Sequence, residues 1–594
     1  MARVARKAAA GLTGLTVLAG MLSACGGGDR PAGAVAGPPR KGGTLRIVGS
    51  SDVEHLDTAS ANSAGSYGLT RTFARTLFGT RASNVFAETV AVQADVAARI
   101  PTRENGGISA DRRVYTVHLR PGVRWNTEPP RPVTAADFVR GFKRLCNPAS
   151  PSSGKGYYID TIQGMDTFCR GFARVDAKDA AAIAAYQNEH DVPGLRAADD
   201  DTLVFRLRRP AGDFLNLLTL QYTAAAPREY DRHLPDGPEF RQHTLSNGPY
   251  RIAEYRPGRS YLLTHNPVWR PETDPLRSRH AARIQITLGQ DSPEAVQQQI
   301  ERGDADLSWD QPVPTAALPR VRRDRRFAIR ELPSNNPYLV FNTRSPNNGG
   351  ALAKPEVRRA LAHAVDRSAL VKIVGGPDVA QPLHTVIPPG TTGYAPSDRY
   401  ATPGAVGDPG KCRELLGRTG HRDLTLRFPY RTNSVHRLIA QSIAANLEAC
   451  GVRTRLTADS GGNFHARTIS TPEQARAGAW DIAAPGWIPD WYGNNGRTLI
   501  APLFDGRDWE TGSTNYGGYD DFVVNGLIDA ALTAPDERHA AGLWQQADQK
   551  VTQDAAIVPL LNRSATLFTS ERVRNARFLP TAAGYDYTHI WLSS

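Results

Sequence analysis

Hydrophobic and polar residues alternate along several short stretches of this 594-residue chain. Residues 114–119 and 202–207 have the two-residue period that is typical of β-strands with one buried face, and residues 44–49 are also predicted to form a strand. In other stretches hydrophobic residues recur at every third or fourth position, which is the period of a helix that buries one face. Because both kinds of element are mixed along the chain, the pattern predicts an α/β fold rather than a β-sandwich or a helical repeat.

Two helices are predicted from their end residues. Thr134 and Asp137 have the spacing of an N-terminal capping pair. The buried face of this helix would consist of Phe138, Phe142 and Leu145. A second helix is expected to begin at Ser292–Pro293 and to end near Gly303, because proline is favoured at helix starts and glycine at helix ends.

Two further helices are predicted in the second half of the chain. One begins at Pro355 and is expected to continue to Gly375–Gly376. Its hydrophobic stripe would consist of Val357, Ala360, Leu361, Ala364 and Val365. The other runs from Asn433 to Cys450 and is followed by a strand over residues 452–456. The residues expected to face inward on it are Leu438, Ile439, Ile443 and Leu447.

The first 28 residues have the pattern of a secretion signal. Basic residues precede a hydrophobic stretch from Ala8 to Leu22, which is shorter than the roughly 20 residues of a membrane-spanning helix. Leu22-Ser23-Ala24-Cys25 resembles a bacterial lipobox, in which the cysteine is lipidated. We therefore expect residues 1–24 to be a lipoprotein signal peptide and residues 25–40 a flexible linker rich in Gly and Pro. The body of the protein would then be lipid-anchored at the extracytoplasmic face of the cell membrane, with a plain secretion signal and an incidental cysteine as the alternative.

Four further cysteines occur in two local pairs. Cys146 and Cys169 are 23 residues apart, and Cys412 and Cys450 are 38 residues apart. Because disulfides persist outside the cell, we predict the bonds 146–169 and 412–450, with free buried thiols as the alternative. Neither CxxC nor HExxH is present, so the sequence predicts no metal site and no cofactor.

The chain is basic, with 71 Lys and Arg residues against 59 Asp and Glu residues and a formal net charge of +12. These basic residues are spread along the sequence. The densest run, residues 321–326, is interrupted by an aspartate and lacks aromatic residues. Since a nucleic-acid-binding protein needs a coherent basic face, we expect no nucleic-acid partner.

A series of short motifs follows in a fixed order along the chain. The most specific are Tyr115–Trp125 (YTVHLRPGVRW) and Pro132–Phe138 (PVTAADF), which join an alternating strand to the start of a helix. The others are Gly42–Arg46, Leu56–Asp57, Asn247–Tyr250, Asn266–Trp269, Gly303–Leu307, Phe341–Asn342 and Val357–Arg367. In this order they resemble the family 5 extracellular solute-binding proteins of ABC importers, the peptide- and nickel-binding group.

The resemblance implies a three-lobed periplasmic-binding-protein-like fold of type II, similar to cluster C, whose hinged lobes close over a ligand. Lobe I would combine residues 41–78, 221–307 and 556–594. Lobe II would be an insertion of residues 79–220, and lobe III would span residues 308–555.

The resemblance also implies a ligand site in residues 484–493 (APGWIPDWYG). In peptide-binding members, the matching Gly-Trp-x-x-Asp element carries an aspartate that pairs with the α-ammonium of the ligand, and Asp490 occupies this position. Such a pair forms a short, charge-assisted hydrogen bond. Trp487, Trp491 and Tyr492 would exclude water and pack against ligand side chains. Alternatively, these aromatic residues belong to the core of the lobe and Asp490 caps a turn. Trp491-Tyr492 replaces the more usual aspartate–tyrosine pair, which leaves the ligand class open.

The function implied is that of a non-enzymatic, monomeric receptor that captures oligopeptides or similar small solutes. It would deliver them to a membrane permease that works with cytoplasmic ATPases, since this chain has no G-x-x-x-x-G-K-[ST] loop of its own. A sensor lipoprotein and a binder of a nickel chelate or a sugar are alternatives. An exported hydrolase is a further alternative, although the sequence has neither G-x-S-x-G nor H-E-x-x-H.

Overall fold

The computed structural model describes residues 38–593, except residues 62, 422, 433, 460–463, 508, 511 and 512. The predicted signal peptide and Cys25 lie outside the described residues, so the lipid anchor stays a prediction. Within the described part of the chain, no helix is both long and apolar enough to span a membrane.

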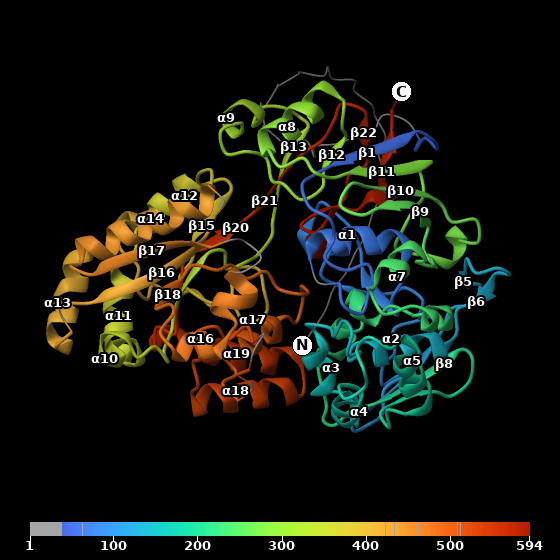
Figure 1. The fold of residues 1–594 in the computed structure, drawn as a ribbon, viewed down its shortest axis with the longest axis horizontal. Helices are drawn as coiled ribbons and strands as arrows, with labels where there is room; N and C mark the ends of the chain where they lie inside the picture. Colours follow the sequence, from blue (N-terminus) through green and yellow to red (C-terminus); the bar gives the residue numbers. More distant parts are fainter. Residues whose placement is uncertain are drawn as a thin grey trace, which may run out of the picture. The chain divides into compact units, whose positions relative to one another are not determined.

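A five-stranded sheet is assembled from distant segments, in the order β12 (Leu307–Ser308), β1 (Thr44–Val48), β11 (Arg283–Thr287), β10 (Ser260–His265) and β9 (Tyr250–Arg256) (Figure 1). Strand β1 is parallel to both of its neighbours, whereas β10 is antiparallel to β11 and to β9. Leu45 and Ile47 of β1 are fully buried. The first predicted strand is therefore confirmed, and it joins residues more than 200 positions further along the chain.

Two helices accompany this sheet, α1 (Ala64–Phe73) and α8 (Pro293–Arg302). Ser292 caps α8 by accepting a hydrogen bond from the Ala295 amide, and Pro293 occupies the first turn. Gly303 ends the helix with a φ of 80°, a left-handed conformation that glycine adopts without steric cost. The predicted helix has the boundaries that its end residues indicated.

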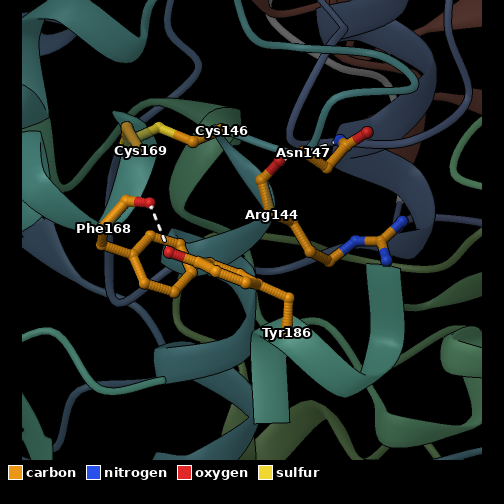
Figure 2. The surroundings of a disulfide bond; sticks show 6 residues. All are labelled: Arg144, Cys146, Asn147, Phe168, Cys169 and Tyr186. Atoms are coloured by element: carbon orange, nitrogen blue, oxygen red, sulfur yellow. Dashed lines mark hydrogen bonds between the residues drawn. A yellow bond between two sulfur atoms is a disulfide. The ribbon is translucent and has the colours of Figure 1, made fainter. Parts of the chain in front are cut away.

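A second region contains the antiparallel strands β4 (Val114–His118), β8 (Thr202–Arg206) and β7 (Leu195–Ala197), and the helices α2 (Ala135–Arg144), α3 (Lys155–Ile159), α4 (Met165–Phe172) and α5 (Ala180–Glu189). Thr134 and Asp137 form the predicted capping box of α2. The predicted bond between Cys146 and Cys169 is present and ends within α4, where the Tyr186 hydroxyl donates to the Phe168 carbonyl at 3.1 Å (Figure 2).

In a third region, β14 (Tyr338–Phe341) lies between β18 (Ile482–Ala483) and β19 (Ile557–Pro559), antiparallel to both. Beside this sheet, β16 (Thr425–Arg431) and β17 (Arg453–Asp459) form a parallel pair. The helices are α11 (Pro355–Ala364), α12 (Arg367–Ile373), α13 (Pro409–Thr419), α14 (Ser434–Ala449), α17 (Gly496–Phe504), α18 (Phe522–Thr533) and α19 (Glu537–Gln553) (Figure 1). The predicted bond between Cys412 and Cys450 joins α13 to the end of α14.

Near its C-terminus the chain pairs with earlier segments through two antiparallel ladders. One joins β13 (Phe327–Arg330) to β21 (Ala565–Phe568), and the other joins β15 (Ala380–Pro382) to β20 (Leu561–Arg563). The remaining short elements are β2 (Phe78–Thr80), β3 (Val92–Ala94), β5 (Arg124–Trp125), β6 (Arg131–Pro132), α6 (Phe214–Leu217), α7 (Pro238–Gln242), α9 (Leu318–Val321), α10 (Asn347–Gly350), the π-helical turn Phe464–Ile469, α16 (Pro472–Arg476), β22 (Val573–Arg574), β23 (Phe578–Leu579), β24 (Gly584–Tyr585) and β25 (Trp591–Leu592). The division into three lobes at the predicted boundaries stays a prediction.

Two details of the predicted helices are wrong. The helix expected from Pro355 to Gly375 is broken, because α11 ends at Ala364 and Val365 is extended. Asp366 then accepts a hydrogen bond from the Ala369 amide at 2.9 Å and caps a new helix. An aspartate favours such a cap over a position inside a helix. Leu438 of α14 is 46 % exposed, whereas the other three predicted inward residues are buried, so its side chain lies beside the buried stripe.

Candidate functional site

The loop after β18, residues 484–493, is fixed on two sides. Trp487 exchanges two main-chain hydrogen bonds of 2.8 and 2.9 Å with Asn335, just before β14. Its indole N–H donates to the Thr498 carbonyl of α17 at 2.7 Å. These contacts set the start of the loop that carries Asp490, and they leave the Trp487 ring half-buried.

Asp490 is half-buried and has a neutral partner. The Tyr157 hydroxyl, from α3, donates to Asp490 Oδ2 at 2.6 Å. Burial raises the pKa of the Asp490 carboxyl to about 6, against the opposing effect of this hydrogen bond. No Lys, Arg or His side chain of the described residues lies within 4.0 Å of the carboxylate. The site therefore contains a desolvated acid that lacks a cation.

Tyrosines from other parts of the chain surround this carboxylate. Burial is the main cause that raises the pKa of Tyr67, Tyr157 and Tyr222, and the negative charge of Asp490 raises each pKa further. The rings of Tyr67 and Tyr222 meet edge to face with centroids 6.5 Å apart. Tyr157 meets the Trp491 ring in the same way at 5.4 Å. Asp490 thus faces an aromatic wall built from α1, α3 and residues 221–223.

Trp491 and Tyr492 are almost completely buried, at 1 % and 2 % exposure. The Trp491 indole N–H donates to the Asn494 carbonyl at 3.2 Å, and the ring packs with the core residues of the second region. The Tyr492 hydroxyl donates to the Pro333 carbonyl at 3.3 Å, and its ring packs against Phe86 at 5.3 Å. Both rings already have protein partners, so a contact between them and a ligand stays a prediction.

Arg497 of α17 closes the site on the side of α3. Its guanidinium donates to the Tyr157 carbonyl and to the Thr161 hydroxyl at 3.2 Å, and it lies 3.6 Å from Asp213. The guanidinium also lies over the Tyr157 ring, 5.3 Å from its centroid. Since Tyr157 is the hydrogen-bond partner of Asp490, Arg497 holds that partner in place.

The sequence identified the Asp490 loop but gave no signal for its partners. Tyr67, Tyr157 and Tyr222 lie more than 260 residues before Asp490, and no spacing or motif links them to it. Their role depends on the packing of α1 and α3 against the loop, which only the folded chain shows.

Comparison with known proteins gives a consistent result. A family model described as bacterial extracellular solute-binding proteins, family 5 Middle, matches residues 92–508. Di/tripeptide-binding protein 4 of Pseudomonas aeruginosa is 24% identical over 495 residues, which is 81% of this chain and 84% of that protein. The periplasmic oligopeptide-binding protein OppA of Salmonella typhimurium is 24% identical over 459 residues, 76% of each chain.

The fold agrees with solved structures over nearly its whole length. The clavulanic acid biosynthesis oligopeptide binding protein 2 superimposes with a TM-score of 0.82 at 24% identity, covering 95% of this chain and 98% of that one. This similarity confirms the predicted α/β fold of the type II periplasmic-binding-protein class.

Proposed function

The chain belongs to the bacterial extracellular solute-binding proteins of family 5, and from this premise we propose that it captures short peptides outside the cytoplasm for uptake by an ABC permease. Two of the relatives named above bind di- and tripeptides or oligopeptides, according to their names. The role requires reversible binding and no chemical step, so we propose that the protein is not an enzyme.

The observation that carries this proposal is the desolvated Asp490 carboxylate, which has no cation beside it among the described residues. Burying an acid in this way costs free energy unless a positive group pairs with it. The α-ammonium of a peptide has a full positive charge and three N–H donors, so it can satisfy the carboxylate. In our proposal the α-ammonium binds beside Asp490 Oδ2, whose hydrogen-bond partner among the described residues is the Tyr157 hydroxyl.

The aromatic side chains around Asp490 suit the rest of such a ligand. Tyr67 and Tyr157, which feel the Asp490 charge, and Trp487 of the same loop as Asp490 each keep part of their surface accessible. Aromatic walls of this kind exclude water, which strengthens a charge pair between them. Aromatic rings can also pack against ligand side chains of different sizes, because such contacts do not depend on a particular hydrogen-bonding pattern.

The remaining parts of the proposal concern location and partners. We propose that Cys25 carries a lipid and holds the monomeric protein at the extracytoplasmic face of the membrane. The permease subunits would then bind the loaded receptor, and cytoplasmic ATPases would supply the energy for uptake. A sensor would use the same binding site but a different partner.

Native mass spectrometry of the protein after Cys25, purified from a peptide-rich host, tests the proposal directly. We expect a heterogeneous set of short peptides to be released on denaturation. A single species without a free ammonium would contradict the role of Asp490. Recovery of cleaved products after long incubation with a purified peptide would instead indicate a hydrolase.

A further inference from the structure

Two arginines and two histidines gather around the end of β16. Arg431 ends β16, His436 lies in α14, His465 lies in the π-helical turn and Arg563 ends β20. A guanidinium N–H of Arg431 donates to His436 Nε2, and the guanidinium lies 5.8 Å from the centroid of the Phe464 ring. In the part of the chain that the structure describes, no carboxylate lies within 4.0 Å of Arg431 or Arg563.

The cluster holds two positive charges at neutral pH. Burial lowers the pKa of Arg431 to about 10, which leaves its guanidinium protonated, and it also lowers the pKa of Arg563. Burial and the Arg431 charge lower the pKa of His436 to about 3 and that of His465 to about 4, so both imidazoles are neutral. All four side chains nevertheless keep part of their surface accessible. They are therefore deep enough to be desolvated and open enough to meet a ligand.

Arg431 and Arg563 retain most of their hydrogen-bonding capacity. Apart from the bond to His436, the guanidinium of Arg431 makes no hydrogen bond to a described residue, and its Nε atom is buried without a partner there. The Arg563 guanidinium likewise has no hydrogen-bond acceptor among the described residues. A planar guanidinium is suited to bind a carboxylate through two parallel N–H bonds.

Residues 334–336 connect this cluster to the loop that carries Asp490. The Asn336 amide donates to the Leu561 carbonyl of β20 at 2.8 Å, while Asn335 pairs with Trp487 on the other side. Adjacent strands are about 4.8 Å apart, so β20 and Trp487 are separated by roughly 10 Å, the length of about three extended residues. Asn335 belongs to this connecting segment, and both of its polar side-chain atoms are buried without a partner among the described residues.

We propose that the ligand carries two carboxylates at the end remote from its ammonium, as a peptide with a C-terminal aspartate or glutamate does. The terminal and side-chain carboxylates bind Arg431 and Arg563, while the ammonium binds Asp490. The charges then balance at both ends of the site, with one pair at Asp490 and two at the arginines. This inference rests on the proposed function, because it takes the ligand to be a peptide.

Calorimetric titration of the protein after Cys25, freed of bound peptides by refolding, tests this specificity. The probes are the tripeptides Ala-Ala-Ala, Ala-Ala-Glu and Ala-Ala-Lys. We expect Ala-Ala-Glu to bind at least about tenfold more tightly than Ala-Ala-Ala, because one extra charge-assisted contact forms. Ala-Ala-Lys should bind more weakly than both, and the preference for Ala-Ala-Glu should decrease at high salt.

The variants Arg431→Gln and Arg563→Gln identify the residues responsible. Each should abolish most of the preference for Ala-Ala-Glu while Ala-Ala-Ala still binds, which also shows that the variant is folded. Arg437→Gln is the matched control, since Arg437 lies in α14 next to His436 but is exposed. The Arg437→Gln variant should prefer Ala-Ala-Glu over Ala-Ala-Ala as strongly as the unaltered protein does.

The possible failures can be distinguished. If Ala-Ala-Ala and Ala-Ala-Glu bind the unaltered protein equally well, the peptide-binding function holds and the inference of a dianionic ligand end is wrong. If the preference exists but survives both substitutions, the assignment to Arg431 and Arg563 is wrong. If none of these tripeptides binds, the proposed function fails and this inference fails with it.

Discussion

Asp490→Asn removes one negative charge while it keeps the size and shape of the side chain. If Asp490 holds the ligand ammonium, removing the charge from this desolvated pair should weaken peptide binding by ~2–5 kcal/mol. At 25 °C this corresponds to a dissociation constant at least about 30-fold higher. The Tyr157 hydroxyl, 2.6 Å from Oδ2, can still donate to the amide oxygen, so the loop should keep its conformation.

The raised pKa of Asp490 adds a dependence on pH. The ammonium pairs with the ionised carboxylate, and with a pKa of about 6 only about a tenth of the unliganded sites is ionised at pH 5. Peptide affinity should therefore rise about tenfold between pH 5 and pH 7, where the peptide ammonium stays protonated. Asparagine does not titrate, so this rise should be absent from the Asp490→Asn variant.

The free energy of unfolding of the unliganded protein should fall as the pH rises from 5 to 7, whereas the peptide affinity should rise. The folded pKa of about 6 lies above the unfolded value of about 3.9, so the folded protein binds the proton more tightly. The stabilisation of the folded protein by this bound proton is fully present below pH 4 and is lost as the pH rises through 6. At pH 7 the charged carboxylate thus costs up to about 3 kcal/mol, and Asp490→Asn should raise the melting temperature there. At pH 4 the two proteins should be equally stable.

Calorimetric titration at pH 5 and pH 7 and thermal unfolding at pH 4 and pH 7 measure both effects. Asp291→Asn is a suitable control, because Asp291 is exposed on the loop before α8. A variant at position 490 that keeps both the affinity and its pH dependence would refute the ammonium site. A variant that is less stable at pH 7 would show that the charge is satisfied within the protein.

Three further changes test separate parts of the reasoning. Tyr157→Phe removes a hydrogen bond that lowers the pKa of Asp490, so the pKa should rise further. The midpoint of the affinity-versus-pH curve should then move above about 6, and an unchanged midpoint would contradict this. Cys412→Ser removes the disulfide to Cys450, 38 residues away, and should lower the free energy of unfolding in denaturant by about 2–4 kcal/mol. An unchanged denaturant midpoint would show that the bond does not stabilise the protein. Cys25→Ala should leave the protein unlipidated, and partition of this variant into detergent like the unaltered protein would rule out the lipobox.

Local features of the fold could be predicted because they depend on neighbouring residues. The capping pair Thr134–Asp137, the end of α8 at Gly303 and both disulfides are each determined within about 40 residues of sequence. The sequence does not predict the break between α11 and α12, because the hydrophobic stripe continues through Val365. Asp366 caps the next helix instead of continuing α11, and the spacing of hydrophobic residues does not show which of the two occurs.

The candidate site could be predicted only in part. Residues 484–493 were identifiable because their composition is unusual and contiguous. The tyrosines and the basic cluster were not, since they come from elements separated by up to several hundred residues. Arg431 and Arg563, for example, are 132 positions apart, and only the folded chain brings them close enough for the Arg563 charge to lower the pKa of Arg431.

The contrast with other buried charges in the same chain supports a ligand-binding role for Asp490, Arg431 and Arg563. Arg75 and Arg277 are buried with Asp95, at 2.8 Å from its two carboxylate oxygens. In that network each desolvated charge has its counter-charge within the protein, which is what folding alone requires. The three residues of the site have no such counter-charge among the described residues. Asp548 and Arg367 are also buried without a counter-charge there, but main-chain groups satisfy them, since Asp548 accepts from two amides and Arg367 Nε donates to two carbonyls. The described main chain supplies no such partner for Asp490, Arg431 or Arg563. A ligand that carries an ammonium at one end and carboxylates at the other would account together for the acid at Asp490 and for the bases at Arg431 and Arg563.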